Sequence, residues 1–252
     1  MPSTPYALQL YTVRTALDKD PAGTLARVRE AGFNCVELAG THGHRPEAFK
    51  KMLDAAGLTP ISAHIGYPEV VGNTGGAIAH ARILGIHYVV VPWLGGEAFL
   101  TRHDWVHAAR ALDNAGARLR DAGIRLCYHN HAHEFETVEG AVIYDILFDT
   151  AAPDNLALQL DTCWAAVAGN DVPAMIRHYG ARVPLLHIKD YTPGPPPALT
   201  EPGHGCMPWE DIFEAARHSG VVWNIVEQDD NFTHGSIESA RAGAAFMAGA
   251  QA

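Results

Sequence analysis

Short apolar runs alternate along the chain with longer amphipathic or alanine-rich segments, and this alternation repeats eight times. Runs of this kind, rich in Val, Ile, Leu and aromatic residues, are typical of buried strands, whereas the segments between them are long enough to form helices. The predicted strands lie at residues 6–13, 34–38, 58–65, 87–93, 124–130, 156–161, 183–189 and 221–227. The pattern therefore predicts eight consecutive β and α units.

The predicted helices have recognisable faces and ends. In the clearest one, apolar residues recur three and four positions apart, which predicts a face that packs on a sheet and carries Trp105, Ala108, Ala109, Leu112, Ala115 and Leu119. Proline follows Asp20 and Arg45, at positions that suit the first turn of a helix. Glycines such as Gly57 and Gly85 stand just before the next strand and are expected to end the preceding helix.

Eight such units in 252 residues match the size of a (β/α)8 barrel, or TIM barrel, and near-continuous apolar strands suit a parallel sheet covered by helices. The structural alternative is a doubly wound open sheet, but no G-x-G-x-x-G motif follows the first strand. No linker divides the chain, so residues 1–252 are expected to form one domain. A stretch rich in proline and glycine, residues 192–208, follows the seventh strand, and we expect it to form a movable cover over the reaction face.

Composition narrows the classes of function. The formal net charge of −10, from 18 basic and 28 acidic residues, disfavours binding to nucleic acid or to an anionic membrane. No apolar run approaches the roughly 20 residues of a membrane span, and the first residues lack the pattern of a secretion signal. The four cysteines lie far apart without a C-x-x-C pair, as is usual for reduced thiols. We therefore expect a cytoplasmic protein, and a symmetric homo-oligomer is common for barrels of this size.

Polar and ionisable side chains gather at the carboxyl ends of the predicted strands. The stretch VPLLHIKDY, residues 183–191, shows the change, because its apolar first half is followed by His187, Lys189 and Asp190. In a TIM barrel all strands end on the same face, so polar residues from distant strands are expected to meet there. The residues concerned are Glu37, His64, His129, His131, Glu134, Asp161, His187, Lys189 and Glu227.

Two glutamates, one aspartate and one histidine from this group can hold a divalent cation. Carboxylates with a single imidazole favour Mn²⁺, Mg²⁺ or Co²⁺ over a cysteine-rich zinc site, with Zn²⁺ as a further candidate. Several residues near this predicted site can instead have a purely structural role. His64 can be a buried core histidine, Lys189 can neutralise nearby carboxylates, and Trp93 and Trp164 can pack in the core instead of forming walls for a sugar ring.

Taken together, the strand-end motifs resemble those of the xylose isomerase-like barrels, the sugar phosphate isomerases and epimerases, and especially their inosose dehydratase-like branch. The resemblance spans the whole chain and rests on ALQLYTVR, YHNHAHEFE, LDTCWAAVAGND, HIKD and VEQD. It implies one divalent ion, Mn²⁺ by preference, held by Glu134, Asp161, His187 and Glu227. We expect a sugar or polyol substrate to contact His64, His129, His131, Trp164 and Lys189.

One position departs from the pattern of this family. Many members carry the first glutamate at the end of strand five itself, where this chain has His129, and Glu134 follows five residues later. Glu134 is the preferred ligand because the motif resembles a recurring variant, and His129 or His131 is the alternative. Glu37 is expected to pair with a neighbouring base or to serve the site without binding the ion, so its replacement should leave metal loading nearly intact.

The ion and two glutamates suggest a mechanism. A cation that bridges a carbonyl oxygen and an adjacent hydroxyl acidifies the C–H between them by stabilising an enediolate. If Glu134 and Glu227 flank opposite faces of the substrate, one removes the proton and the other returns it, as in an isomerase or epimerase, which is the preferred function. The alternative is a dehydratase of inosose or 3-keto-sugar type. An abasic-site endonuclease, which the acidic charge disfavours, and a non-catalytic sugar-binding barrel are further alternatives.

Overall fold

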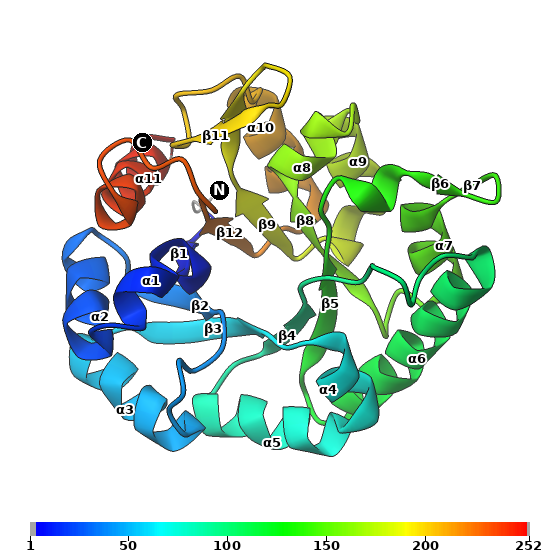
Figure 1. Cartoon of the computed structure of the whole chain (residues 1–252), viewed down its shortest axis with the longest axis horizontal. Coiled ribbons are helices and arrows are strands. Elements are labelled where there is room, and N and C mark those ends of the chain that lie inside the picture. Colours follow the sequence, from blue (N-terminus) through cyan, green and yellow to red (C-terminus); the bar gives the residue numbers. More distant parts are fainter. Residues whose placement is uncertain (1–3, 251–252) are drawn as a thin grey trace.

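The computed structural model describes residues 4–250, which form a closed barrel of eight parallel strands enclosed by helices (Figure 1). Around the barrel each strand pairs with its neighbour in chain order, and β12 pairs with β1 to close the ring. The predicted TIM barrel is thus confirmed. The barrel strands are β1 Tyr6–Gln9, β2 Cys35–Leu38, β3 Thr59–His64, β4 Tyr88–Val91, β5 Arg125–His129, β8 Ala157–Asp161, β9 Leu185–Ile188 and β12 Trp223–Val226.

Helices follow the strands and cover the outside of the barrel (Figure 1). The α-helices are α1 Arg14–Leu17, α2 Pro21–Glu30, α3 Pro46–Ala56, α4 Tyr67–Gly72, α5 Thr74–Leu84, α6 Arg102–Asp121, α7 Ile143–Thr150, α8 Thr162–Val167, α9 Val172–Tyr179, α10 Trp209–Ser219 and α11 Ser236–Ala250. Short 3-10 turns lie at Leu10–Val13, His133–Phe135 and Gly180–Arg182. The predicted apolar face of α6 is buried along its whole length.

The local signals at the helix ends act as the sequence predicts. The Asp20 side chain accepts a hydrogen bond from the Gly23 backbone N–H, and Pro21 occupies the first turn of α2. Gly57 and Gly85 adopt left-handed conformations, with φ of 71° and 73°, and end α3 and α5. These caps bring the chain back to the amino end of the next strand.

The first strand is shorter than predicted. The sequence predicts a strand over residues 6–13, but β1 ends at Gln9 and a 3-10 turn covers Leu10–Val13. The Gln9 side chain accepts a hydrogen bond from the Tyr11 backbone N–H, which stabilises this turn. As a result, Tyr11 lies at the mouth of the barrel and remains 42% exposed.

The inside of the barrel changes from apolar to polar toward the carboxyl ends of the strands. Its apolar layer consists of Ala7, Ile61, Val90, Cys127, Ala157, Leu185 and Ile225. Side chains two positions apart on a strand share a face, so the residue two positions after each member of this layer also points into the barrel. On five of the strands that residue is polar. These residues are Gln9, His129, Gln159, His187 and Glu227, and all five are buried. The apolar layer therefore forms the floor of a polar mouth.

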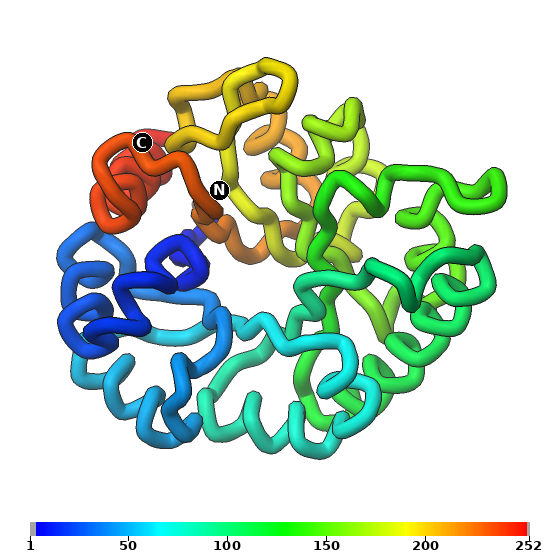
Figure 2. Tube along the Cα trace, viewed as in Figure 1, coloured from blue at the N-terminus to red at the C-terminus, as the bar shows by residue number. Residues whose placement is uncertain are grey.

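Two hairpins interrupt the β/α alternation, and the sequence does not predict them. One consists of β6 (Thr137–Val138) and β7 (Ala141–Val142), and the other of β10 (Asp190–Thr192) and β11 (Ala198–Thr200). In the tube view both stand at the rim of the molecule (Figure 2). The second hairpin begins the segment that was predicted to be a movable cover.

Two buried carboxylates hold this segment in place. Asp190 accepts hydrogen bonds from the backbone N–H groups of Gly203, Gly205 and Met207, and from the Trp209 indole N–H. Gly205 is needed there, because a Cβ at this position would overlap the Asp190 carboxylate. A loop wrapped around a buried anion in this way is preshaped by its hydrogen bonds.

Glu201, the second carboxylate, connects the same segment to α11. It is 4% exposed and accepts hydrogen bonds from the Ser239 hydroxyl at 2.6 Å and from the Thr233 N–H and hydroxyl at 3.1 and 2.9 Å. Burial opposes ionisation, but these hydrogen bonds outweigh it and lower the pKa of Glu201 to about 2.

Among residues 4–250, no helix is both long enough and apolar enough to cross a membrane. The cysteines Cys35, Cys127, Cys163 and Cys206 are all free. Burial raises the pKa of Cys127 and of Cys163 well above the ordinary value of a thiol, so both stay protonated at neutral pH.

The replacement Glu201→Gln is expected to lower the free energy of unfolding by about 1–3 kcal/mol at pH 7, because a charged acceptor of buried hydrogen bonds is lost. The folded pKa lies below the ordinary value of 4.5, so this stabilisation is present above pH 4.5 and is lost as the pH falls toward 2. Denaturant unfolding at several pH values should show the two proteins converging over this range. The control is Glu238→Gln on the exposed side of α11, and a gap that does not change with pH would contradict the assignment.

Candidate active site

A cavity of about 530 Å³ opens at the carboxyl ends of the strands. It is lined by Tyr11, Ala39, Gly40, His64, Pro92, Trp93, His129, His131, Lys189, Glu227 and Asp229. None of these lining residues comes from the segment 192–208, which lies beside the cavity and is held by Asp190 and Glu201. In this structure the segment therefore contributes no residue to the cavity lining, and its movement over the reaction face stays a prediction.

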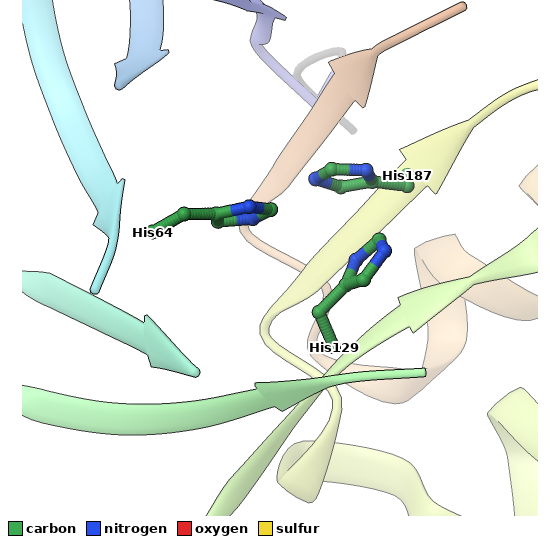
Figure 3. A group of neighbouring side chains, drawn as sticks. All are labelled: His64, His129 and His187. Atoms are coloured by element: carbon green, nitrogen blue, oxygen red, sulfur yellow. The ribbon is translucent and has the colours of Figure 1, made fainter. Parts of the chain in front are cut away.

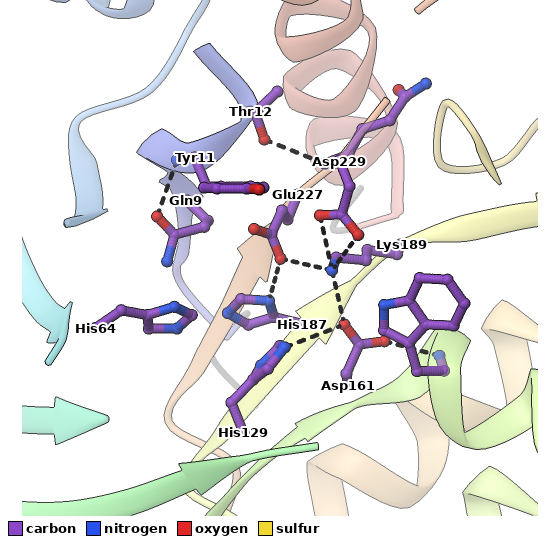
Figure 4. Close-up of polar contacts among 12 residues, drawn as sticks. Gln9, Tyr11, Thr12, His64, His129, Asp161, His187, Lys189, Glu227 and Asp229 are labelled. Carbon is purple, nitrogen blue, oxygen red and sulfur yellow. Dashed lines mark hydrogen bonds and ion pairs between the residues drawn. The ribbon is translucent and has the colours of Figure 1, made fainter. Parts of the chain in front are cut away.

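Four buried side chains from four strands meet in the mouth. Ligand atoms of His129, Asp161, His187 and Glu227 all lie within 4.8 Å of one another. The register of the barrel explains this, because Asp161 on β8 pairs directly with His187 on β9, and His187 pairs with Ile225 on β12. Figure 4 shows the four groups pointing toward a common centre. Three of them, Asp161, His187 and Glu227, belong to the predicted ligand set.

Lys189 adds a cation to this centre. It is 2% exposed, and its Nζ lies 2.7 Å from Glu227 Oε2, 3.1 Å from Asp161 Oδ2 and 3.0 Å from Asp229 Oδ1 (Figure 4). Burial disfavours the charged form, but the three carboxylates outweigh it and raise the pKa of Lys189 well above its ordinary value. Lys189 is therefore an ammonium group at neutral pH.

His187 bridges two carboxylates. Its Nδ1 lies 2.8 Å from Glu227 Oε2, and its Nε2 lies 2.7 Å from Glu37 Oε1. Burial alone would keep the imidazole neutral, but Glu227 and Glu37 raise the pKa of His187 to about 10. In turn, despite burial, the Lys189 and His187 cations hold the pKa of Glu227 far below its ordinary value. The charges in the mouth thus stabilise one another.

The centre carries more negative than positive charge. Four carboxylates, those of Glu37, Asp161, Glu227 and Asp229, face the two cations Lys189 and His187. Asp161 Oδ2 is buried and accepts no hydrogen bond, although Lys189 Nζ lies 3.1 Å away. Buried anions without full compensation are costly, so this donor set is suited to a further cation. A buried His/Asp/Glu cluster of this kind is a candidate site for a divalent metal ion.

Three imidazoles stand side by side in the mouth. The rings of His64 and His187 are stacked with their centroids 5.6 Å apart, and the ring of His129 lies 4.5 Å from that of His187 (Figure 3). Burial and the neighbouring His187 hold the pKa of His129 well below its ordinary value, and burial together with Lys189 lowers the pKa of His131 to about 3. His129 and His131 are consequently neutral at pH 7 and available as nitrogen ligands or hydrogen-bond partners.

Glu134 lies apart from the centre. It belongs to the 3-10 turn His133–Phe135, where its Oε1 accepts a hydrogen bond from the Tyr128 hydroxyl and its Oε2 one from the His131 N–H. Successive residues of β5 point to opposite sides of the barrel wall, so Tyr128 faces the helices while His129 faces the mouth. Among the described residues, Glu134 falls into a separate group with His131 and His133.

The remaining predicted site residues lie either in the cavity lining or in the helix that follows β8. His64 and His131 line the cavity. Trp164 lies in the first turn of α8, where its backbone N–H donates to Asp161 Oδ1, and its ring centroid lies 6.0 Å from Lys189 Nζ. Its buried indole N–H has no hydrogen-bond partner. Trp164 therefore positions Asp161 and Lys189 from outside the cavity lining.

Sequence reasoning missed several residues of the site. Asp229 follows the eighth strand and lines the cavity, where burial and Glu227 raise its pKa to about 6. Gln9 and Gln159 are buried amides within otherwise apolar strands. The sequence does contain a signal for these two residues, namely a glutamine within a run of apolar residues. An amide buried without a hydrogen-bond partner costs free energy, so a glutamine at such a position indicates a partner inside the barrel.

Comparisons with known proteins agree on the family. The family described as "Xylose isomerase-like TIM barrel" matches residues 25–249. An inosose dehydratase from Lacticaseibacillus casei is 27% identical over 241 residues, covering 80% of this chain and 79% of the relative. A sugar phosphate isomerase/epimerase from Parabacteroides distasonis is 25% identical with a TM-score of 0.84, covering 98% and 94% of the two chains.

An L-ribulose 3-epimerase structure is 20% identical with a TM-score of 0.72 and covers 98% of this chain and 94% of its own, which supports the fold. The family match extends over nearly the whole barrel and includes all four residues of the buried cluster. The chain belongs to the xylose isomerase-like TIM barrel family.

Proposed function

We propose that the protein is a metal-dependent dehydratase that removes water from a keto-polyol of the inosose or 3-keto-sugar type. One observation carries this proposal: the carboxylates that line the cavity, Glu227 and Asp229, both follow β12. An epimerase that works on two faces of a carbon needs a second base, and Glu134 is occupied by Tyr128 and the backbone of His131. Similarity to an inosose dehydratase supports the same choice.

We propose His129, Asp161, His187 and Glu227 as the residues that would hold the ion, with His129 in place of Glu134. Asp161 Oδ2, which accepts no hydrogen bond, and the excess of carboxylates in the mouth fit a divalent cation. Two imidazoles with two carboxylates suit Mn²⁺, Co²⁺ or Zn²⁺ better than Mg²⁺, which prefers oxygen ligands. When bound, the ion supplies positive charge that stabilises the enolate form of the substrate.

The ionisation states of two side chains support a division of roles. Glu227 is a carboxylate at neutral pH and accepts the proton from the carbon next to the substrate carbonyl. Lys189 is an ammonium group and donates a proton to the β-hydroxyl. The electron pair of the broken C–H bond forms a C=C bond, the β C–O bond breaks, and the hydroxyl leaves as water. Solvent then restores the proton of Lys189 and takes that of Glu227.

The cavity favours an uncharged ring as substrate. Lys189 is the one Lys or Arg among the cavity-lining residues described, and three carboxylates already compensate its charge. A phosphate would thus meet an acidic mouth. Tyr11 and Trp93, 42% and 50% exposed, offer flat apolar surfaces for the C–H faces of a sugar or cyclitol ring. The acidic surface charge likewise opposes a DNA substrate.

An isomerase or epimerase is the second candidate. Burial beside Glu227 raises the pKa of Asp229 to about 6, so this carboxylate can both take up and release a proton near neutral pH. Transfer of a proton along one face of an enediolate would give aldose–ketose isomerisation. Similarity to a sugar phosphate isomerase/epimerase favours the same chemistry. A cytoplasmic location and a symmetric homo-oligomer are retained as proposals from composition and size.

Protein stripped with a chelator and reloaded with Mn²⁺ is expected to bind about one equivalent per chain, measured by elemental analysis after gel filtration. Asp161→Asn and His129→Gln should each weaken binding more than about tenfold, because each removes a direct ligand. Glu134→Gln should bind within about threefold of wild type. Loss of the ion in Glu134→Gln with retention in His129→Gln would restore Glu134 as the ligand, and no binding by wild type would reject the centre.

Inososes, ketoses and 3-keto sugars screened at saturating Mn²⁺ should identify a substrate that gains an enone absorbance. With that substrate, Lys189→Met should lower the rate of water loss by about 10²–10⁴-fold, because the leaving hydroxyl loses its proton donor. Exchange of the proton next to the carbonyl with solvent deuterium, followed by NMR, should persist in Lys189→Met and disappear in Glu227→Gln. Water loss at the wild-type rate in Lys189→Met would remove Lys189 from the mechanism, and an isomeric sugar without enone would establish the second candidate.

A further inference from the structure

A carboxylate lies beneath the candidate metal centre, inside the barrel. Glu37 at the end of β2 is completely buried. Its Oε1 is within hydrogen-bond distance of Gln9 Nε2 at 2.8 Å and His187 Nε2 at 2.7 Å, and its Oε2 accepts from Ser62 Oγ and Gln159 Nε2, both at 2.6 Å. Burying an ionised carboxylate costs free energy even when donors surround it. Replacing buried charged groups by apolar residues of similar size often leaves a protein equally stable or more stable. The apolar layer just below shows that this barrel can be filled without it.

The contact with His187 has a consequence for the ring. An ionised carboxylate only accepts hydrogen bonds, so the Nε2 atom that faces Glu37 at 2.7 Å carries a proton. The other ring nitrogen, Nδ1, points to Glu227 at 2.8 Å and thus to the centre. A carboxylate behind a histidine ligand fixes the orientation of the ring and makes the free nitrogen more basic.

Glu37 also determines the orientation of the Gln159 amide. The group 2.6 Å from Glu37 Oε2 must be the donating NH₂ of Gln159, so the amide oxygen faces the other way. That oxygen lies 3.1 Å from His129 Nδ1 and 2.8 Å from His64 Nε2. The Nδ1 atom of His129 is then the protonated one, and its Nε2 atom, 3.8 Å from Asp161 Oδ2, is left for the centre.

We propose that Glu37 is a positioning residue that sets the tautomers of both imidazoles, directly for His187 and through Gln159 for His129. Nε2 of His129 then faces the centre as a lone pair, and Nδ1 of His187 would become one when a divalent cation displaces the proton that it shares with Glu227. This inference rests on the proposed metal centre and deepens it. It also reverses the sequence-based expectation that replacing Glu37 leaves metal loading nearly intact.

The first test compares the affinity of the stripped protein for Co²⁺ in wild type, Glu37→Gln and Ser62→Ala. Glu37→Gln should raise the Kd about 10–100-fold, the usual cost of losing the carboxylate behind a histidine ligand, and should change the visible spectrum of bound Co²⁺. Ser62→Ala is the matched control, because it removes another hydrogen bond to Glu37 without touching either imidazole. It should keep the Kd within about threefold even if the melting temperature falls.

The second test needs no variant and decides the matter if Glu37→Gln does not fold. In wild-type protein with ¹⁵N-labelled histidine and bound Zn²⁺, NMR should show a proton on Nε2 of His187 and on Nδ1 of His129. The opposite tautomers, or a Kd for Co²⁺ that is equal in wild type and Glu37→Gln, would overturn the positioning role and leave the proposed function standing. Wild-type protein that binds neither ion would overturn the centre and this inference together.

Discussion

The mouth of the barrel depends on the mutual compensation of buried charges. Asp161, Glu227 and Asp229 surround the Lys189 ammonium group, and Glu37 with Glu227 holds the His187 ring between them. Each carboxylate alone would be driven to protonate by burial, and each cation alone would be driven to deprotonate. Together, the charges of Lys189, His187 and Glu227 stabilise one another, so these three buried groups remain ionised at neutral pH. Removing one member leaves an uncompensated charge, which costs far more than the pair contributes.

The barrel geometry makes this arrangement available at small cost to the rest of the fold. Strands change from apolar to polar within two residues, as from Ala157 to Gln159 or from Leu185 to His187, so the polar mouth rests on a packed apolar floor. Loops outside the mouth are held by separate buried anions, Asp190 and Glu201. The carboxylates that hold the segment 192–208 are therefore different from those that line the cavity.

The eight strands, their order and the helix caps could be predicted because they depend on local patterns: apolar runs, proline at helix starts and glycine at helix ends. The position of a side chain that follows a strand at some distance also depends on the local turn and on tertiary hydrogen bonds. Glu134 follows β5 by five residues, and whether it returns to the mouth depends on a 3-10 turn and on the Tyr128 hydroxyl. His129 needed no such information, because the alternation of β5 alone directs it inward.

The network below the centre could not be read from spacing, since Gln9, Glu37, Ser62 and Gln159 lie on four strands and meet only when the barrel closes. A rule would still have flagged them: each is a polar residue in a run that is otherwise buried and apolar. Such a residue needs partners, and the parallel register supplies them. The proposal of a dehydratase in preference to an isomerase rests on another contact that spacing does not reveal, since Glu134 accepts hydrogen bonds from the Tyr128 hydroxyl and the His131 N–H.

The proposed metal centre uses the His129 imidazole beside Asp161, His187 and Glu227. Anomalous diffraction at the manganese absorption edge, from crystals of the protein grown with Mn²⁺, tests this most directly. One strong peak per chain is expected, within coordination distance of Nε2 of His129, Nδ1 of His187 and the carboxylates of Asp161 and Glu227. A peak at the separate group of His131, His133 and Glu134, or one coordinated by Glu134 in place of His129, would contradict it.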